Sequence, residues 1–192
     1  MALFNDYQDF ALHTMWEYLA MARRCIETRQ EESADGCYGM AALLLLTSVM
    51  DTLGSFYPHK QYTPRTQDDI DNDNVGSVAG HFENFCARFI SDDSAEIAAF
   101  HKNLYQQARC KAVHNSALTS GIKITNDANQ PLFNSDYTMS NIVKLHDKVE
   151  KAFNIWVYDT YQSNDVAAQL QKHPPIPDTG TTLNNISVQK KS

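Results

Sequence analysis

The sequence has little of what marks secreted, membrane-spanning and disulfide-bonded proteins. Four cysteines are scattered over 192 residues without a Cys-x-x-Cys spacing, which predicts reduced thiols in a cytoplasmic protein. The longest nearly unbroken apolar run, Met40 to Met50, falls short of the about 18–20 residues that a membrane span needs. No basic segment follows Met1, so neither a secretory signal nor membrane association is expected.

Familiar catalytic and metal-binding motifs are also missing. Glycine-rich nucleotide loops, the HExxH zinc motif and the Glu-x-x-His motif of di-iron bundles do not occur. Two pairs, His13 with Glu17 and His146 with Glu150, have the i,i+4 spacing at which two side chains can share a metal. Because this spacing is more typical of a polar helix face, no metal and no other cofactor is expected. A metal-dependent bundle that uses His13, His81 and His146 is the third alternative.

The hydrophobic periodicity predicts an all-α protein of about five helices. The expected helices are 5–27, 40–57, 78–90, 97–114 and 142–161. The second of them is apolar on every side and is expected to be the central helix. A loop is expected at 58–76, and a small β-hairpin of 122–125 with 131–133 is expected before the last helix. Residues 1–172 are expected to form one helical domain, and residues 173–192 a disordered tail.

Charge is unevenly distributed along the chain. The net charge of −7 argues against bulk electrostatic binding to nucleic acid. Residues 97–126, however, contain no Asp or Glu and carry Lys102, Arg109, Lys111 and Lys123, so this segment has a charge of +4 and the remainder −11. Such a basic island in an acidic protein suits a phosphate-binding site, although chance clustering on a solvated helix produces the same pattern.

Within the basic island, Arg109 and His114 carry the chemistry of interest. Five residues of α-helix separate two side chains by about 7.5 Å and 140°, so the pair does not share one helix face. The two residues converge only at a helix end or across a two-fold dimer. Arginine offers a planar donor fork to a phosphate, and histidine moves a proton near neutral pH. Together they suffice for metal-free phosphodiester cleavage. The structural alternative is a surface Arg with a helix-end His that interacts with the helix dipole.

The segment from Leu104 to Asn115 resembles the Arg-x4–6-His motif of the HEPN superfamily, and the apolar helix around 43–54 fits the same resemblance more loosely. The resemblance implies an HEPN-like helical bundle that dimerises with its motifs facing each other across a cleft. It also implies that RNA is cleaved without metal, with the ribose 2′-OH as the nucleophile.

Carried over residue by residue, the resemblance implies that Arg109 binds the scissile phosphate and that His114 acts in proton transfer. Asp51, in the second helix, is the polar residue that supports such a site, and Lys111 and Asn115 lie beside the pair in sequence. The position after the motif arginine, usually Asn, Asp or His in active members, is Cys110 here.

Two functions from different classes follow from this resemblance. The first is a cytoplasmic, homodimeric endoribonuclease of a defence or toxin system, with RNA as substrate and an antitoxin or regulatory protein as partner. Ser116 stands where one subgroup carries a tyrosine, so regulation by a nucleotidyltransferase antitoxin is not supported. The second, favoured by Cys110, is a non-catalytic HEPN-like module that binds a protein or nucleotide.

Overall fold

The protein is described by a computed structural model covering residues 7–28, 38–57, 78–110 and 122–173. The elements are α1 (Tyr7–Glu27), α2 (Gly39–Phe56), α4 (Val78–Phe89), α5 (Ser94–Phe100), the π-helix η2 (His101–Cys110), β1 (Lys123–Thr125), β2 (Met139–Asn141), α7 (Ile142–Tyr161) and α8 (Val166–Lys172). The prediction of a mostly helical fold is therefore confirmed. The expected loop at 58–76 and the tail from residue 174 lie outside the described residues.

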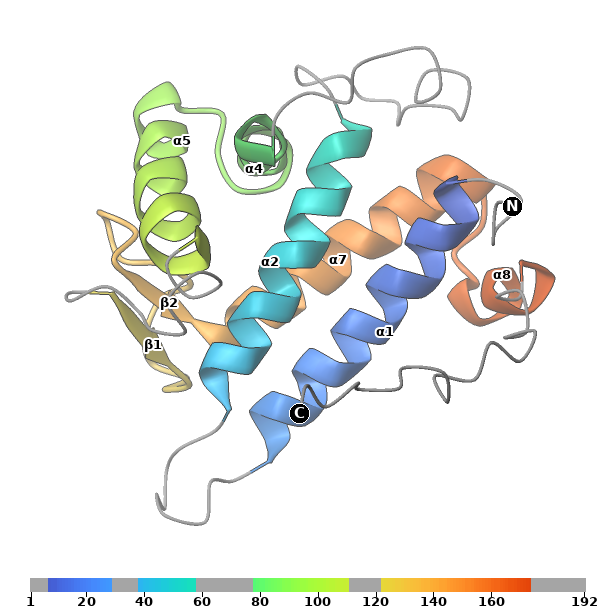
Figure 1. The fold of residues 1–192 in the computed structure, drawn as a ribbon, viewed down its shortest axis with the longest axis horizontal. Coiled ribbons are helices and arrows are strands. Elements are labelled where there is room, and N and C mark those ends of the chain that lie inside the picture. Colours follow the sequence, from blue (N-terminus) through green and yellow to red (C-terminus); the bar gives the residue numbers. More distant parts are fainter. Residues whose placement is uncertain (1–6, 29–37, 58–77, 111–121, 174–192) are drawn as a thin grey trace, which may run out of the picture.

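The central position predicted for the second helix is confirmed. α2 contacts α1, α4, α7, η2 and β1, and it lies between α1 on one side and the α4 and α5 helices on the other (Figure 1). Its fully buried aliphatic side chains include Leu43, Leu46, Val49, Met50 and Leu53. Each such side chain stabilises the fold by about 1.5–3 kcal/mol relative to exposure. Among the described helices, α2 alone is long and apolar enough to cross a membrane, yet 61% of it is buried, as in the core helix of a soluble protein.

The helices α1 and α7 pack against α2 through the apolar faces that the hydrophobic periodicity predicts. On α1 the buried positions at spacings of three and four are Leu12, Met15, Leu19 and Ala22. On α7 they are Leu145, Val149, Ala152, Phe153, Trp156 and Val157. The ring of Trp156 is fully buried and packs on Phe56 of α2, with the ring centroids 5.0 Å apart. The core lies around α2, between α1 and α7 on one side and α4, α5 and η2 on the other.

The predicted β-hairpin is wrong in its pairing. β1 pairs in parallel with β2, not with the segment 131–133 that the sequence suggested. That segment lies along β2 as well, because Phe133 forms an antiparallel bridge with Ser140. The register of the parallel pair is Lys123 with Met139, Ile124 with Ser140, and Thr125 with Asn141.

A tight turn explains the altered pairing. Tyr137 donates its backbone N–H to the carbonyl of Asn134 over 3.1 Å and has a positive φ of 58°. This turn returns the chain directly alongside Leu132, whose carbonyl accepts the N–H of Asn141 over 2.9 Å. The segment 132–133 thus pairs in antiparallel fashion with 140–141, on one edge of β2. The other edge of β2 is then available to β1, which pairs with it in parallel.

The predicted fourth helix begins as expected and then changes geometry. Asp93 caps α5, its side chain accepting the N–H groups of Ala95 and Glu96. From His101 the backbone continues as a π-helix rather than an α-helix. In a π-helix the bonds run between residues five apart, so such residues lie on nearly the same side, in contrast to the 140° expected of an α-helix. The expected end of this helix near residue 114 lies outside the described residues.

α8 was not predicted, so α7 is not the last helix of the chain. It starts at a cap in which Asp165 accepts the N–H of Ala168 over 3.0 Å. Its end is attached to α1, since His173 Nδ1 lies 2.9 Å from the buried carboxylate of Asp9. Tyr161 donates its hydroxyl to the same carboxylate over 3.3 Å, and His13 bonds to the carbonyl of His173. Figure 1 shows α8 beside the N-terminal end of α1.

Candidate functional site

Two of the predicted site residues, Asp51 and Arg109, come together in the structure. Asp51 lies in the second half of α2, and its Oδ2 accepts a hydrogen bond from Arg109 Nη2 of the π-helix over 3.5 Å. Its other oxygen, Oδ1, lies 3.2 Å from Nδ1 of His81 on α4. The side chains of Asp51, His81 and Arg109 are 17%, 13% and 23% exposed, so one carboxylate joins two basic groups at a mostly buried position.

A close approach of two helices positions His81. Gly54 stands one turn after Asp51, and a Cβ added there would lie 1.8 Å from the backbone carbonyl oxygen of His81. The helices also share a hydrogen bond, in which Asn84 Nδ2 donates to the carbonyl of Gly54 over 3.3 Å. Because only glycine leaves room for this approach, α4 can place His81 against the carboxylate of Asp51.

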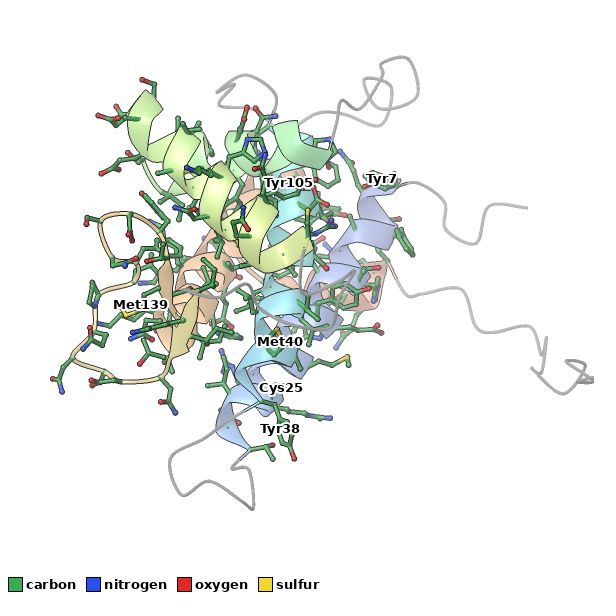
Figure 2. All side chains as sticks on the ribbon, turned by 60° about the vertical axis from the view of Figure 1, so that its left-hand side comes forward. Tyr7, Cys25, Tyr38, Met40, Tyr105 and Met139 are labelled. Carbon is green, nitrogen blue, oxygen red and sulfur yellow. The ribbon has the colours of Figure 1, made fainter. Side chains whose placement is uncertain are left out.

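Tyr105 supports Arg109 from its own helix. The guanidinium carbon of Arg109 lies 5.7 Å from the centre of the Tyr105 ring, within the range of a cation–π interaction. The ring in turn packs on Phe82 of α4, with centroids 5.0 Å apart, and Figure 2 shows Tyr105 where η2 meets α4. Burial, a hydrogen bond with Cys110 and the charge of Asp51 raise the pKa of the Tyr105 hydroxyl, whereas Arg109 lowers it. The hydroxyl is therefore protonated near neutral pH and is not a general base.

Cys110 is a half-buried thiol close to Tyr105, and it is one of the causes of the raised pKa of the Tyr105 hydroxyl. The two residues are five apart, which is the spacing that a π-helix brings together. A thiol is only a weak hydrogen-bond donor and acceptor. The strong polar partner of Arg109 within the described residues is therefore Asp51, from a different helix.

The remaining predicted site residues lie outside the described residues. These are Lys111, His114 and Asn115. Of the basic island, the described part holds Arg109 and two exposed lysines, Lys102 on η2 and Lys123 on β1.

A second histidine–carboxylate pair joins η2 to α4. His101 Nδ1 on η2 is 2.6 Å from Glu83 Oε1 on α4, and its ring packs on that of Tyr105 with centroids 5.2 Å apart. Its other nitrogen, Nε2, is buried and has no hydrogen-bond partner among the residues that the structure describes. Sequence reasoning missed the roles of both His81 and His101, since neither stands at a recognisable spacing from its carboxylate partner.

The metal-bundle alternative is not supported by the placement of its histidines. His13 bonds to the carbonyl of His173, His81 to Asp51, and His146 Nε2 to the carbonyl of Leu19 over 3.1 Å. These partners hold the three imidazoles at different places in the fold, so they form no common ligand set.

The i,i+4 pair on α7 has an explanation without a metal. Ligand atoms of His146, Asp147 and Glu150 lie within 4.8 Å of one another. Both carboxylate oxygens of Glu150, however, accept hydrogen bonds from Arg23 Nη2 over 2.8 Å, so a guanidinium already supplies positive charge there. Two cavities of about 260 and 270 Å³ open between α1 and α7 around Arg23 and Glu27, and neither is lined by Asp51 or Arg109.

Comparisons with family models, with curated proteins and with solved structures found no match to this chain.

Proposed function

We propose that this protein is an HEPN-like, metal-independent endoribonuclease of a defence or toxin system, which acts in the cytoplasm as a homodimer. The observation that carries the proposal is the setting of Arg109. The motif arginine contacts the carboxylate of Asp51 and the ring of Tyr105 in a mostly buried position. A guanidinium fixed in this way is preorganised for a phosphate, because little side-chain freedom remains to be lost on binding.

Arg109 and His114 have complementary parts in the proposed reaction. The 2′-oxygen of the ribose attacks phosphorus, a new O–P bond forms and the bond to the 5′-oxygen breaks. The products are a 2′,3′-cyclic phosphate and a 5′-hydroxyl. One His114 takes the proton of the 2′-OH, and an imidazolium at the site returns a proton to the leaving 5′-oxygen, so no metal is needed. Arg109 stabilises the extra negative charge of the pentacoordinate phosphate.

Two copies of the motif around one cleft supply both proton-transfer groups. The resemblance implies a two-fold dimer in which each copy contributes one arginine and one histidine to a shared cleft. Light scattering of the purified protein should therefore give twice the chain mass of 21.7 kDa. A monomer at micromolar concentration would contradict the dimeric site.

The central experiment compares cleavage of single-stranded RNA in EDTA by wild type, Arg109→Ala and His114→Ala. We expect each variant to lose cleavage by about 10²-fold or more, since a single electrostatic donor is worth about 10²–10³ and a proton-transfer group about 10²–10⁴. Lys102→Ala is the matched control, because it removes the same charge from an exposed position of the same helix. It should lower the rate only modestly.

Two outcomes would contradict the assignment of these residues. Equal cleavage by wild type and His114→Ala would mean that another site or a contaminating nuclease cuts the RNA. Loss of cleavage in EDTA by the wild type would mean that a metal is required. Cleavage should also weaken with added salt, because the basic island is then screened.

The second candidate function is a non-catalytic HEPN-like module that binds a protein or nucleotide partner. Cys110 favours it, since a thiol is only a weak hydrogen-bond donor and acceptor and offers the phosphate little. A wild-type protein that is folded and dimeric but does not cleave RNA would support this candidate. A defence or toxin–antitoxin gene adjacent to the gene for this protein would favour the endoribonuclease, with an antitoxin or regulatory protein as partner.

A further inference from the structure

We infer that His81 is a positioning residue of this site: its charge sets how strongly Asp51 holds Arg109, and RNA binding therefore strengthens when His81 is protonated. The inference rests on the proposed function, because it concerns the same phosphate. It differs from that function in assigning a regulatory role to a residue outside the Arg-x4-His motif.

The geometry of Asp51 is the first step of the argument. Each of its two oxygens serves a different basic group, with His81 Nδ1 at 3.2 Å from Oδ1 and Arg109 Nη2 at 3.5 Å from Oδ2. A neutral imidazole donates one N–H to the carboxylate, and the full negative charge of Asp51 is then directed at Arg109. An imidazolium competes for the negative charge of Asp51. Less of the positive charge of the Arg109 guanidinium is then neutralised, and more of it is left to attract a phosphate.

The charge balance gives the sign. With His81 neutral, Asp51 and Arg109 form a pair without net charge, and with His81 protonated the group carries +1. Within the described ranges, Tyr105 and Cys110 of η2 are further titratable groups close to Arg109 and Asp51. A phosphodiester stays singly negative near neutral pH, so a pH dependence of its binding comes from the protein or from a base.

Burial sets the size of the effect. The three side chains are between 13% and 23% exposed, so solvent screens their mutual interaction less than it screens a surface pair. One extra charge at this range is worth on the order of threefold to tenfold in affinity for an anion. Histidine is the side chain whose ordinary pKa brings such a change within physiological pH.

The test measures binding of a single-stranded RNA whose 2′-oxygens are methylated, which removes the nucleophile and separates binding from cleavage. Affinity for the wild type should rise about threefold to tenfold between about pH 8 and pH 6. His81→Asn should lose this rise, because the asparagine amide reproduces the Nδ1 donor without its charge. Asp51→Asn should also lose it, although His81 is intact, because the link to Arg109 is broken.

His101→Asn is the matched control. It removes an imidazole of η2 that is also paired with a carboxylate, but with Glu83 of α4 and not with Asp51 of α2. It should keep the pH dependence of the wild type. Circular dichroism of each variant shows that the fold is retained.

The outcomes separate this inference from the proposed function. If the wild type binds no RNA, the proposed function fails and the inference with it. If the wild type binds RNA and His81→Asn keeps the full pH dependence, only the inference is overturned. If Asp51→Asn keeps the dependence while His81→Asn loses it, His81 acts on the RNA directly, and its role as a positioning residue is wrong.

Discussion

Asp51 shows how far a single residue can be interpreted from its neighbours in sequence. A carboxylate within the most apolar helix needs a partner or an edge position, and the resemblance made Asp51 a supporting residue of the motif. In the structure, Asp51 pairs with Arg109. The contact with His81 has no such signal, because it depends on the approach of α2 and α4 at Gly54. One glycine thus decides whether the carboxylate serves one basic group or two.

The first prediction concerns that glycine. Gly54→Ala places a methyl group 1.8 Å from the carbonyl oxygen of His81, so the two helices must move apart. We expect a loss of about 2–3 kcal/mol in the free energy of unfolding, although alanine favours a helix by about 1 kcal/mol. Urea unfolding followed by circular dichroism measures it. Ser48→Ala, on the same helix, is the control and should change stability by less than about 1 kcal/mol. An unchanged midpoint for Gly54→Ala would contradict the close approach.

At the scale of elements, the sequence predicted regular helices better than irregular ones. Hydrophobic spacing located α1, α2, α4 and α7 to within two residues of their bounds. It could not distinguish the α-helical from the π-helical turns of 94–110, because buried Phe100, Leu104 and Ala108 recur every four residues, a spacing that both geometries tolerate. It missed α8, which is short and relies on contacts with α1 and α7.

The junction of the sheet with α7 depends on Asn141, and the second prediction tests it. The side chain is fully buried, accepts the N–H of Lys144 over 3.2 Å, and donates to the carbonyls of Asp127 and Gln130. Asn141→Ala should lower the free energy of unfolding by about 2–3 kcal/mol, since a cap is worth about 1 kcal/mol and the carbonyls lose their donor.

Two further variants complete the Asn141 experiment. Asn141→Asp keeps the capping oxygen but turns a buried oxygen toward the two carbonyls, so it should destabilise the fold at least as much as Asn141→Ala. Asp165→Ala removes an exposed cap from α8 and should cost about 1 kcal/mol or less. Equal effects of Asn141→Ala and Asp165→Ala in urea unfolding would show that the turn contacts contribute nothing.

For the whole molecule, a buried cysteine thiol and buried tyrosine hydroxyls predict that the fold is destabilised at alkaline pH. Burial is the main cause that raises the pKa of Cys86 from 9.0 to about 12 and that of Tyr137 from 10.0 to about 12, and burial also raises the pKa of Tyr57. The folded protein therefore keeps protons that the unfolded chain releases above about pH 9. The free energy of unfolding should fall as pH rises from about 9 to 12, and stay free of this effect below that range.

The third prediction isolates one of these groups. Tyr137→Phe keeps the ring and removes the ionisable hydroxyl, so the decline in urea midpoint between about pH 9 and pH 11 should become shallower. Tyr158→Phe is the control, because the Tyr158 side chain is 45% exposed, and it should leave the decline unchanged. The same decline for Tyr137→Phe and wild type would mean that this tyrosine does not contribute to alkaline unfolding.

The sequence by itself determined the helical class, the central helix and the need of Asp51 for a partner or an edge position, because these follow from local spacing and from the cost of burying a charge. Only the tertiary structure decided the parallel pairing of β1 with β2 and the joining of His81, Asp51 and Arg109. Those side chains are 30 and 58 residues apart along the chain, so their contacts depend on how whole helices pack. Packing is set by shape at particular places, such as the missing side chain of Gly54, and no local periodicity encodes it.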